Sequence, residues 1–193
     1  ANNLVQYRKN LTIDLFLFSK KLIVYRAKLA PELQSQLPEL FVNAILDAII
    51  TGAGEGLQVR GFEEGDGEEN VLQRVTLDKV DKAREVLNWI KKQEEEIEIF
   101  IETEHDMKRM KGFVARISHE GMKEPAYIAK VLPSSYVAKA GTAWMVRDAR
   151  FVPFDAEATL RVPPDNQVLI IDQDIFVFNQ TRLKQLFGYS AKE

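Results

Sequence analysis

The sequence predicts an α+β fold in which a largely antiparallel mixed sheet is flanked by two or three helices. Two observations favour this class. Segments with strand-like alternation outnumber segments with helical spacing, and most connections between them are of hairpin length. A doubly wound parallel sheet would instead require a helix after nearly every strand.

The first two strands and the first helix are predicted from apolar spacing. Apolar residues alternate along Leu11–Phe18, and a Lys20-Lys21 turn leads into a second strand over Leu22–Leu29. Pro31 suits the first turn of a helix, which Gly52 would end. Its apolar stripe is wide, so this helix is expected to be buried on more than one side: Leu37, Leu40, Phe41, Val42, Ala44, Ile45, Leu46, Ala48, Ile49 and Ile50.

A hairpin and a second helix are expected next. The segments 56–62 and 71–77 are strand-like and enclose an acidic loop at 63–69. Asp78 is placed to cap a helix, because an apolar stripe at helical spacing follows it. That stripe consists of Val80, Ala83, Leu87 and Ile90.

The second half of the chain is predicted to be rich in strands. It ends in a hairpin whose turn is Asp172-Gln173-Asp174, followed by a short helix capped at Asn179. Trp89 and Trp144 are both expected in the core. The predicted strands are 97–103, 112–118, 126–132, 142–146, 160–162, 168–171 and 175–178.

Length and chain ends suggest how the protein is organised. The 193 residues are expected to form a single α+β domain over 1–193, with a sub-boundary near 104–111. The start Ala1-Asn2-Asn3 lacks a methionine, and we expect this chain to be the N-terminal part of a longer protein.

Composition excludes several classes of site. The chain has no cysteine, which rules out disulfides and thiolate metal sites, and it has no apolar run of the roughly 20 residues that span a bilayer. The net charge of −3 is unevenly distributed: residues 1–106 carry −7 and residues 107–193 carry +4. Any surface that binds a polyanion is therefore expected to be local and in the second half.

Three constellations resemble catalytic, cofactor or metal sites in part. The glycine-rich segment 51–56 follows a helix and precedes a strand, the reverse of a phosphate-binding loop, and is interpreted as a connector. His105 lies among acidic residues, but metal binding competes there with a solvated turn. Asp165, Asp172 and Asp174 could hold a metal in a nuclease, yet turn chemistry also explains the last two. We expect no catalytic residue, cofactor or metal site.

Basic residues give the better indication of binding. Lys108, Arg109 and Lys111 cluster between predicted strands, Arg116 lies on the polar face of one strand and Lys130 in the next. Five cations on one sheet face and its edge predict contacts to nucleic-acid phosphates. The alternative is an ordinary hydrated sheet face.

The last third of the chain also resembles a known family. Its features run from Tyr127-Ile128-Ala129-Lys130 to Phe187-Gly188-Tyr189, and between these lie Leu160-Arg161-Val162, Val168–Ile171 and Ile175–Asn179. In order and spacing they are similar to the end of the N-terminal region of the Kiwa anti-phage B-protein family, formerly a bacterial domain of unknown function.

The resemblance implies a non-enzymatic defence component that binds DNA and a small membrane-embedded partner protein. It implies a cytoplasmic location, at the inner face of the membrane through that partner and without direct insertion. A homo-oligomer is expected. Two alternatives stay open: an oligomerisation or protein-interaction scaffold, and a metal-dependent nuclease in which Asp165, Asp172 and Asp174 hold Mg²⁺.

Overall fold

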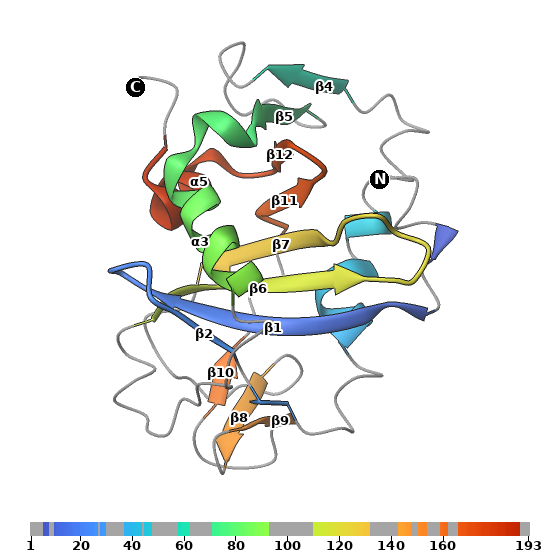
Figure 1. Cartoon of the computed structure of the whole chain (residues 1–193), viewed down its shortest axis with the longest axis vertical. Coiled ribbons are helices and arrows are strands. Elements are labelled where there is room, and N and C mark those ends of the chain that lie inside the picture. Colours follow the sequence, from blue (N-terminus) through green and yellow to red (C-terminus); the bar gives the residue numbers. More distant parts are fainter. Residues whose placement is uncertain are drawn as a thin grey trace.

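A large twisted sheet forms the centre of the protein, and a small sheet lies beside it (Figure 1). The computed structural model describes residues 6–7, 10–26, 28–29, 37–43, 45–47, 58–61, 71–92, 110–131, 143–147, 150–153, 159–161 and 166–189. In spatial order the large sheet contains β2 (Val24–Arg26), β1 (Thr12–Ser19), β6 (Met110–Ser118), β7 (Ala126–Val131), β11 (Val168–Ile171), β12 (Asp174–Val177), β5 (Val71–Thr76) and β4 (Gln58–Gly61).

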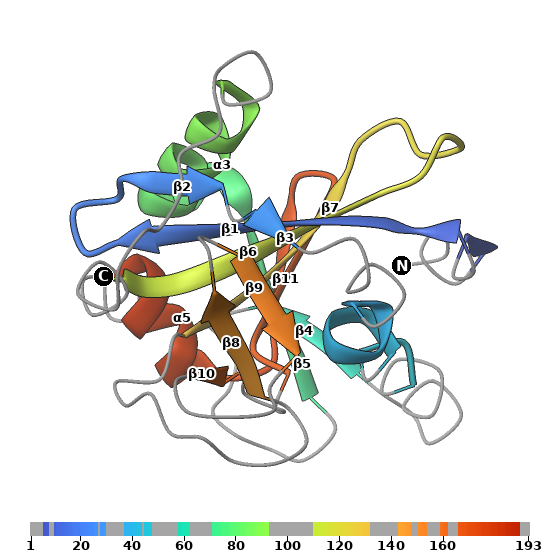
Figure 2. The same cartoon turned by 90° about the horizontal axis from the view of Figure 1, so that it is seen from below.

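Neighbouring strands of the large sheet are antiparallel except β4 and β5. The small sheet is likewise mixed, since β3 is parallel to β9 and the other pairs are antiparallel. One residue after β2 the chain enters the small sheet as β3 (Figure 2). The small sheet contains β10 (Thr159–Arg161), β8 (Ala143–Arg147), β9 (Arg150–Pro153) and β3 (Lys28–Leu29).

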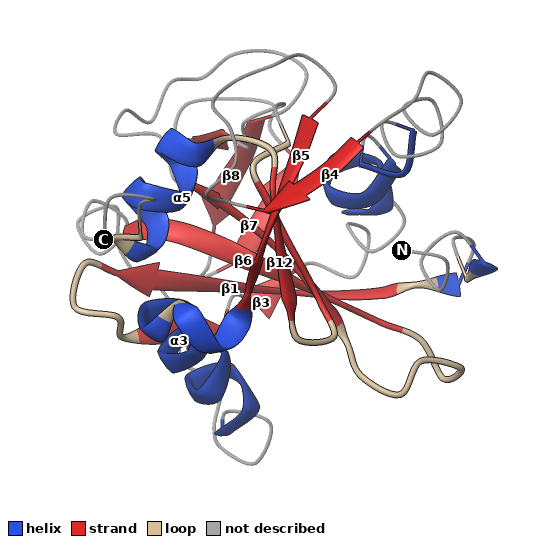
Figure 3. Cartoon of the chain, turned by 90° about the horizontal axis from the view of Figure 1, so that it is seen from above, coloured by secondary structure: helices blue, strands red, loops and turns tan. Residues whose placement is uncertain are grey.

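Helices cover both faces of the large sheet (Figure 3). On one face, α3 (Asp81–Lys92) and α5 (Gln180–Phe187) pack on apolar side chains such as Phe16 and Phe18. On the other face lies a helical segment at 37–47, which includes the π-helical turn η3 (Glu39–Asn43). The fold is therefore α+β, with a largely antiparallel mixed sheet flanked by helices, as the sequence predicts.

Apolar periodicity explains which side chains enter each core. Successive residues of β1 point to opposite faces, so Ile13, Leu15 and Leu17 pack against the 37–47 segment. Within that segment, residues spaced around the helix are buried, which confirms that it is covered on more than one side. They are Leu37, Phe41, Val42, Ile45 and Leu46.

The last helix begins and ends where the sequence predicts. The Asn179 side chain accepts a hydrogen bond from the Arg182 backbone N–H at 3.2 Å, which caps the N-terminus of α5. At the other end Gly188 adopts a left-handed conformation, with φ of 65°, and donates its N–H to the Lys184 carbonyl. Both termini are thus satisfied locally.

Three predictions about local structure were wrong. The segments at β4 and β5 pair in parallel and so do not form a hairpin, because alternation indicates a strand but not its direction. Helix α3 begins at Asp81, after a 3-10 turn, η4 (Leu77–Lys79), that contains Asp78. Trp89 is 41% exposed, since its position on α3 lies outside the buried stripe of that helix.

Several predicted features lie outside the described residues. They are the strand 97–103, the glycine-rich segment 51–56, the acidic loop 63–69, His105, Asp165 and most of the sub-boundary at 104–111. Trp144 lies on β8, whose side chains are also outside the description. No helix within the described ranges is both long and apolar enough to cross a membrane.

Candidate anion-binding site

The turn between β1 and β2 presents two lysines in a fixed conformation. Ser19 and Ile23 close the turn through a backbone hydrogen bond of 2.9 Å, and the Ser19 hydroxyl accepts from the N–H groups of Lys21 and Ile23. Leu22 adopts φ of 61°, which is uncommon for a leucine, and its side chain is buried. The buried leucine and the serine hydroxyl therefore hold Lys20 and Lys21 at an exposed tip.

A β-bulge places Lys111 beside this turn. Phe18 pairs with Gly112, but the next residue, Ser19, pairs with Met110, so Lys111 is the extra residue of β6. Bulges redirect the side chain of the extra residue. Lys111 is half-buried and is electrostatically coupled to Lys82 of α3, which packs over the face that carries Phe18.

Lys82, in the first turn of α3, is a further cation near Lys111. Lys82 reaches the C-terminal end of α5, where a Cβ atom on Gly188 would lie 3.0 Å from the Lys82 Nζ. A helix C-terminus carries partial negative charge, so it attracts an ammonium group. Lys82 therefore lies where α3 meets the C-terminal end of α5.

These three side chains form a site with surplus positive charge, the lysine cluster: Lys20, Lys82 and Lys111. Burial lowers the pKa of Lys111, and the charges of Lys82 and then Lys20 lower it further. Within the described residues none of the three lysines forms an ion pair with a carboxylate. An anion bound here would supply the missing counter-charge.

Of the five predicted nucleic-acid contacts, Lys111 belongs to the lysine cluster and two others are buried elsewhere. The Arg116 side chain is 9% exposed, and its guanidinium bonds the Asp14 carboxylate at 2.9 Å. Lys130 is 1% exposed, and its Nζ lies 5.8 Å from the centre of the Phe41 ring in the opposite core. The prediction that these two side chains belong to an exposed sheet face is corrected, because helices cover both faces.

Lys108 and Arg109 lie outside the described residues, directly before β6 in the sequence. Sequence reasoning missed Lys20 and Lys82 as members of the site. The predicted turn at Lys20 indicates that this side chain is exposed. That Lys20 lies near Lys111 depends on the pairing of β1 with β6, which the sequence does not indicate. For Lys82, only the packing of α3 on α5 reveals its place.

Asp14 joins two cations next to the ring of Phe16. Its carboxylate accepts from Arg26 at 3.1 Å and from Arg116 at 2.9 Å. Both guanidinium groups also lie near the Phe16 ring, at 5.9 and 5.1 Å from its centre. This arrangement links β2, β1 and β6 and neutralises part of the charge of the arginines, so its role is structural.

The carboxylates considered for a nuclease occupy a hairpin turn. Asp172 is exposed at the tip between β11 and β12 with φ of 56°, and Asp174 pairs with Thr76 of the neighbouring strand β5. No group of three or more histidine, aspartate or glutamate side chains that could hold a metal ion occurs in the described ranges. His119 stacks on Tyr7, with ring centres 4.2 Å apart.

Comparison of the chain with models of protein families, with curated proteins and with solved structures gave no match in any of the three.

Proposed function

We propose that this chain is a non-enzymatic component of anti-phage defence that binds DNA, and that the lysine cluster contacts the DNA phosphates. The observation that carries the proposal is the convergence of Lys20, Lys82 and Lys111 without a carboxylate partner among the described residues. The positive charges of Lys82 and Lys20 act on Lys111 and lower its pKa, so these ammonium groups repel that of Lys111. A phosphate backbone supplies closely spaced negative charges that relieve this repulsion.

The surroundings of the lysine cluster also support phosphate binding. Lys21 is exposed in the same turn, and Lys108 and Arg109 precede β6 in the sequence. The whole chain carries a net charge of −3, so attraction to DNA must come from a local surface. Lysines act as point charges on phosphates and do not read base edges, so binding is expected to be independent of DNA sequence.

The wider biological setting rests on the family resemblance in residues 127–189. It supports a DNA-binding protein that associates with a small membrane-embedded partner at the inner face of the membrane. A homo-oligomer is part of the proposal but does not rest on the resemblance. We assign the partner contact to the acidic first half of the chain, where residues 1–106 carry a net charge of −7.

Fluorescence anisotropy with a labelled DNA duplex tests the proposal across a salt titration, with and without Mg²⁺. Affinity is expected to fall with salt and the duplex to remain intact. Each lysine that contacts a phosphate adds about 0.9 to the slope of log affinity against log salt. Lys111→Gln should reduce that slope by about one, and the triple change of Lys20, Lys82 and Lys111 to glutamine by roughly three.

Lys123→Gln is the matched control. Lys123 is exposed in the turn that follows β6, and roughly 25 Å of strand separates that turn from Lys111 at about 3.4 Å per residue. This variant should bind DNA as the wild type does. Absence of binding at low salt would refute the proposal in favour of a scaffold, and cleavage that requires Mg²⁺ would favour a nuclease.

A further inference from the structure

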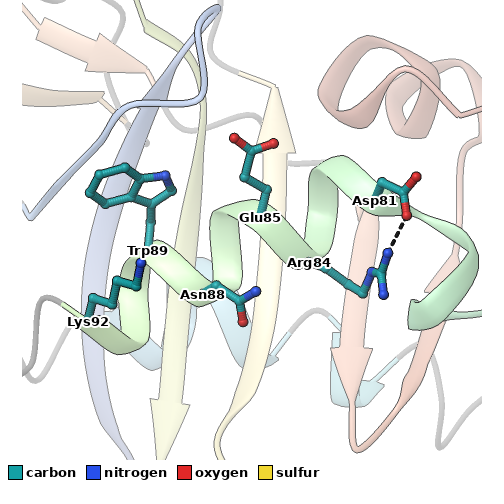
Figure 4. Close-up of a pocket in the computed structure, with 6 residues that line it drawn as sticks. All are labelled: Asp81, Arg84, Glu85, Asn88, Trp89 and Lys92. Atoms are coloured by element: carbon teal, nitrogen blue, oxygen red, sulfur yellow. Dashed lines mark hydrogen bonds and ion pairs between the residues drawn. The ribbon is translucent and has the colours of Figure 1, made fainter.

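The outer side of α3 contains a hollow of about 420 Å³ beside an exposed tryptophan. Figure 4 shows the Trp89 indole and the Glu85 side chain projecting from the same side of the helix, with Lys92 running alongside the indole. Trp89 is 41% exposed and lies outside the buried apolar stripe of α3, so its indole is accessible to a ligand. The hollow is lined by Asp81, Arg84, Glu85, Asn88, Trp89 and Lys92.

The lining groups suit a flat ring that carries hydrogen-bond donors. The Trp89 indole offers a stacking surface, and the Lys92 Nζ lies 5.6 Å from the centre of its ring. Asp81 and Arg84 form an ion pair with each other. Glu85 has no ion pair within the described residues, so its carboxylate can accept hydrogen bonds, and the Asn88 amide can donate or accept them.

Trp89, at one border of the hollow, lies on the same side of α3 as Lys82 of the lysine cluster. Lys82 and Trp89 are seven residues apart, which is close to two helical turns, so their side chains leave the helix in similar directions. The rise of 1.5 Å per residue separates them by roughly 10 Å along the axis.

We propose that this hollow binds an unpaired nucleobase stacked on Trp89, so that the preferred ligand is single-stranded DNA or a duplex with a single-stranded end. The inference rests on the proposed function, because the lysine cluster is taken to hold the phosphates of the same strand. In a duplex the base faces are stacked on each other and only their edges are accessible. An exposed indole therefore recognises a base that has left the stack.

The hollow and the lysine cluster differ in charge, so they suit different parts of a nucleotide. The side chains that line the hollow carry two negative and two positive charges, so the hollow attracts the sugar–phosphate backbone less strongly than the three lysines do. The Glu85 carboxylate accepts from the amino or imino N–H groups of a base. Stacking tolerates any base, so this arrangement adds selectivity for single strands without strong selectivity for sequence.

Anisotropy with three probes of equal length tests the inference: a single-stranded oligonucleotide, its blunt duplex, and an abasic strand that keeps the phosphates but lacks bases. Trp89→Ala should weaken binding of the base-containing single strand by roughly 5- to 150-fold. It should leave the duplex and the abasic strand unchanged, and Trp89→Phe should retain most of the affinity. Lys111→Gln should weaken all three probes.

The outcomes separate the two proposals. Suppose that Lys111→Gln weakens binding of all three probes, while Trp89→Ala either leaves binding unchanged or weakens it equally for all three. The nucleobase site is then refuted and the proposed function stands. If neither variant affects binding, both fail. Should Trp89→Ala not fold, a Trp144→Phe chain leaves Trp89 as its only tryptophan. Its fluorescence should then be quenched by the single strand and not by the abasic strand, and equal quenching by both would overturn the inference.

Discussion

Replacing Asp14 by asparagine is expected to destabilise the fold by about 2–4 kcal/mol, since the Asp14 carboxylate joins two arginines on neighbouring strands. Its two oxygens accept from Arg26 at 3.1 Å and from Arg116 at 2.9 Å. Asparagine keeps one oxygen but loses the charge, and hydrogen bonds to charged partners contribute about 1.5–3 kcal/mol each.

Burial decides how that loss is divided between the arginines. The Arg116 side chain is 9% exposed and cannot regain water, whereas Arg26 is 30% exposed and can. Most of the cost therefore falls on Arg116. At this chain length the change corresponds to a Tm decrease of roughly 4–16 °C, taking about 2–4 °C per kcal/mol.

Urea denaturation and thermal melts of Asp14→Asn measure the effect against Asp81→Asn. The control breaks an exposed ion pair, because the side chains of Asp81 and Arg84 are 83% and 45% exposed, and it should cost less than about 0.5 kcal/mol. Arg116→Met keeps the apolar stem and removes the charge that Asp14→Asn leaves unpaired. The double variant should therefore be destabilised by clearly less than the sum of the two single changes. An Asp14→Asn protein as stable as the Asp81→Asn control would refute the reasoning.

Three further predictions concern single positions. Gly112→Ala should cost about 1–3 kcal/mol in urea denaturation, because the new Cβ would lie 2.6 Å from Leu186 Cδ2 and 2.8 Å from a backbone oxygen; an unchanged midpoint would show that α5 can shift. Asp172→Val should cost about 1–2 kcal/mol, since a β-branched residue tolerates φ of 56° poorly, while Asp172→Gly stays near wild type. Lys111→Met should be more stable than wild type at pH 7. The pKa of Lys111 is lowered because the folded protein disfavours its charge, so the wild type should gain stability as pH rises toward 10.5. The stability difference between Lys111→Met and the wild type should therefore narrow. A difference that stays constant between pH 7 and 10 would contradict this.

Strand positions were predictable because apolar alternation records burial locally. The segments that form β1, β6 and β7 were all identified in this way. The same pattern misled the assignment of Arg116 and Lys130, because a charged residue within an alternating strand looks solvent-facing. Only the tertiary structure shows that both faces are covered, one by α3 and α5 and the other by the 37–47 segment.

The residues of the candidate site come together through contacts between distant parts of the sequence, which the spacing of apolar residues does not reveal. Lys111 was identified from its basic neighbours, but its bulge arises from a register shift against β1, whose residues are about ninety positions away in the sequence. Lys82 enters through helix packing. The exposure of Trp89 was not predicted either. A tryptophan is expected in the core because it is large and apolar, but the angular position of Trp89 on α3 places it outside the buried stripe.

The order of strands has a consequence for how the protein is made. Among the described strands β11 and β12 come latest in the sequence, yet they lie between β7 and β5. The strands β4 and β5 therefore have no partner in the rest of the large sheet until residues 168–177 have left the ribosome. The large sheet cannot be completed until about nine tenths of the 193 residues have been synthesised, and strand edges that are later paired are exposed until then. Such a topology should fold slowly and only once residues 168–177 are available, so newly made chains should depend on chaperones more than chains with local pairing do.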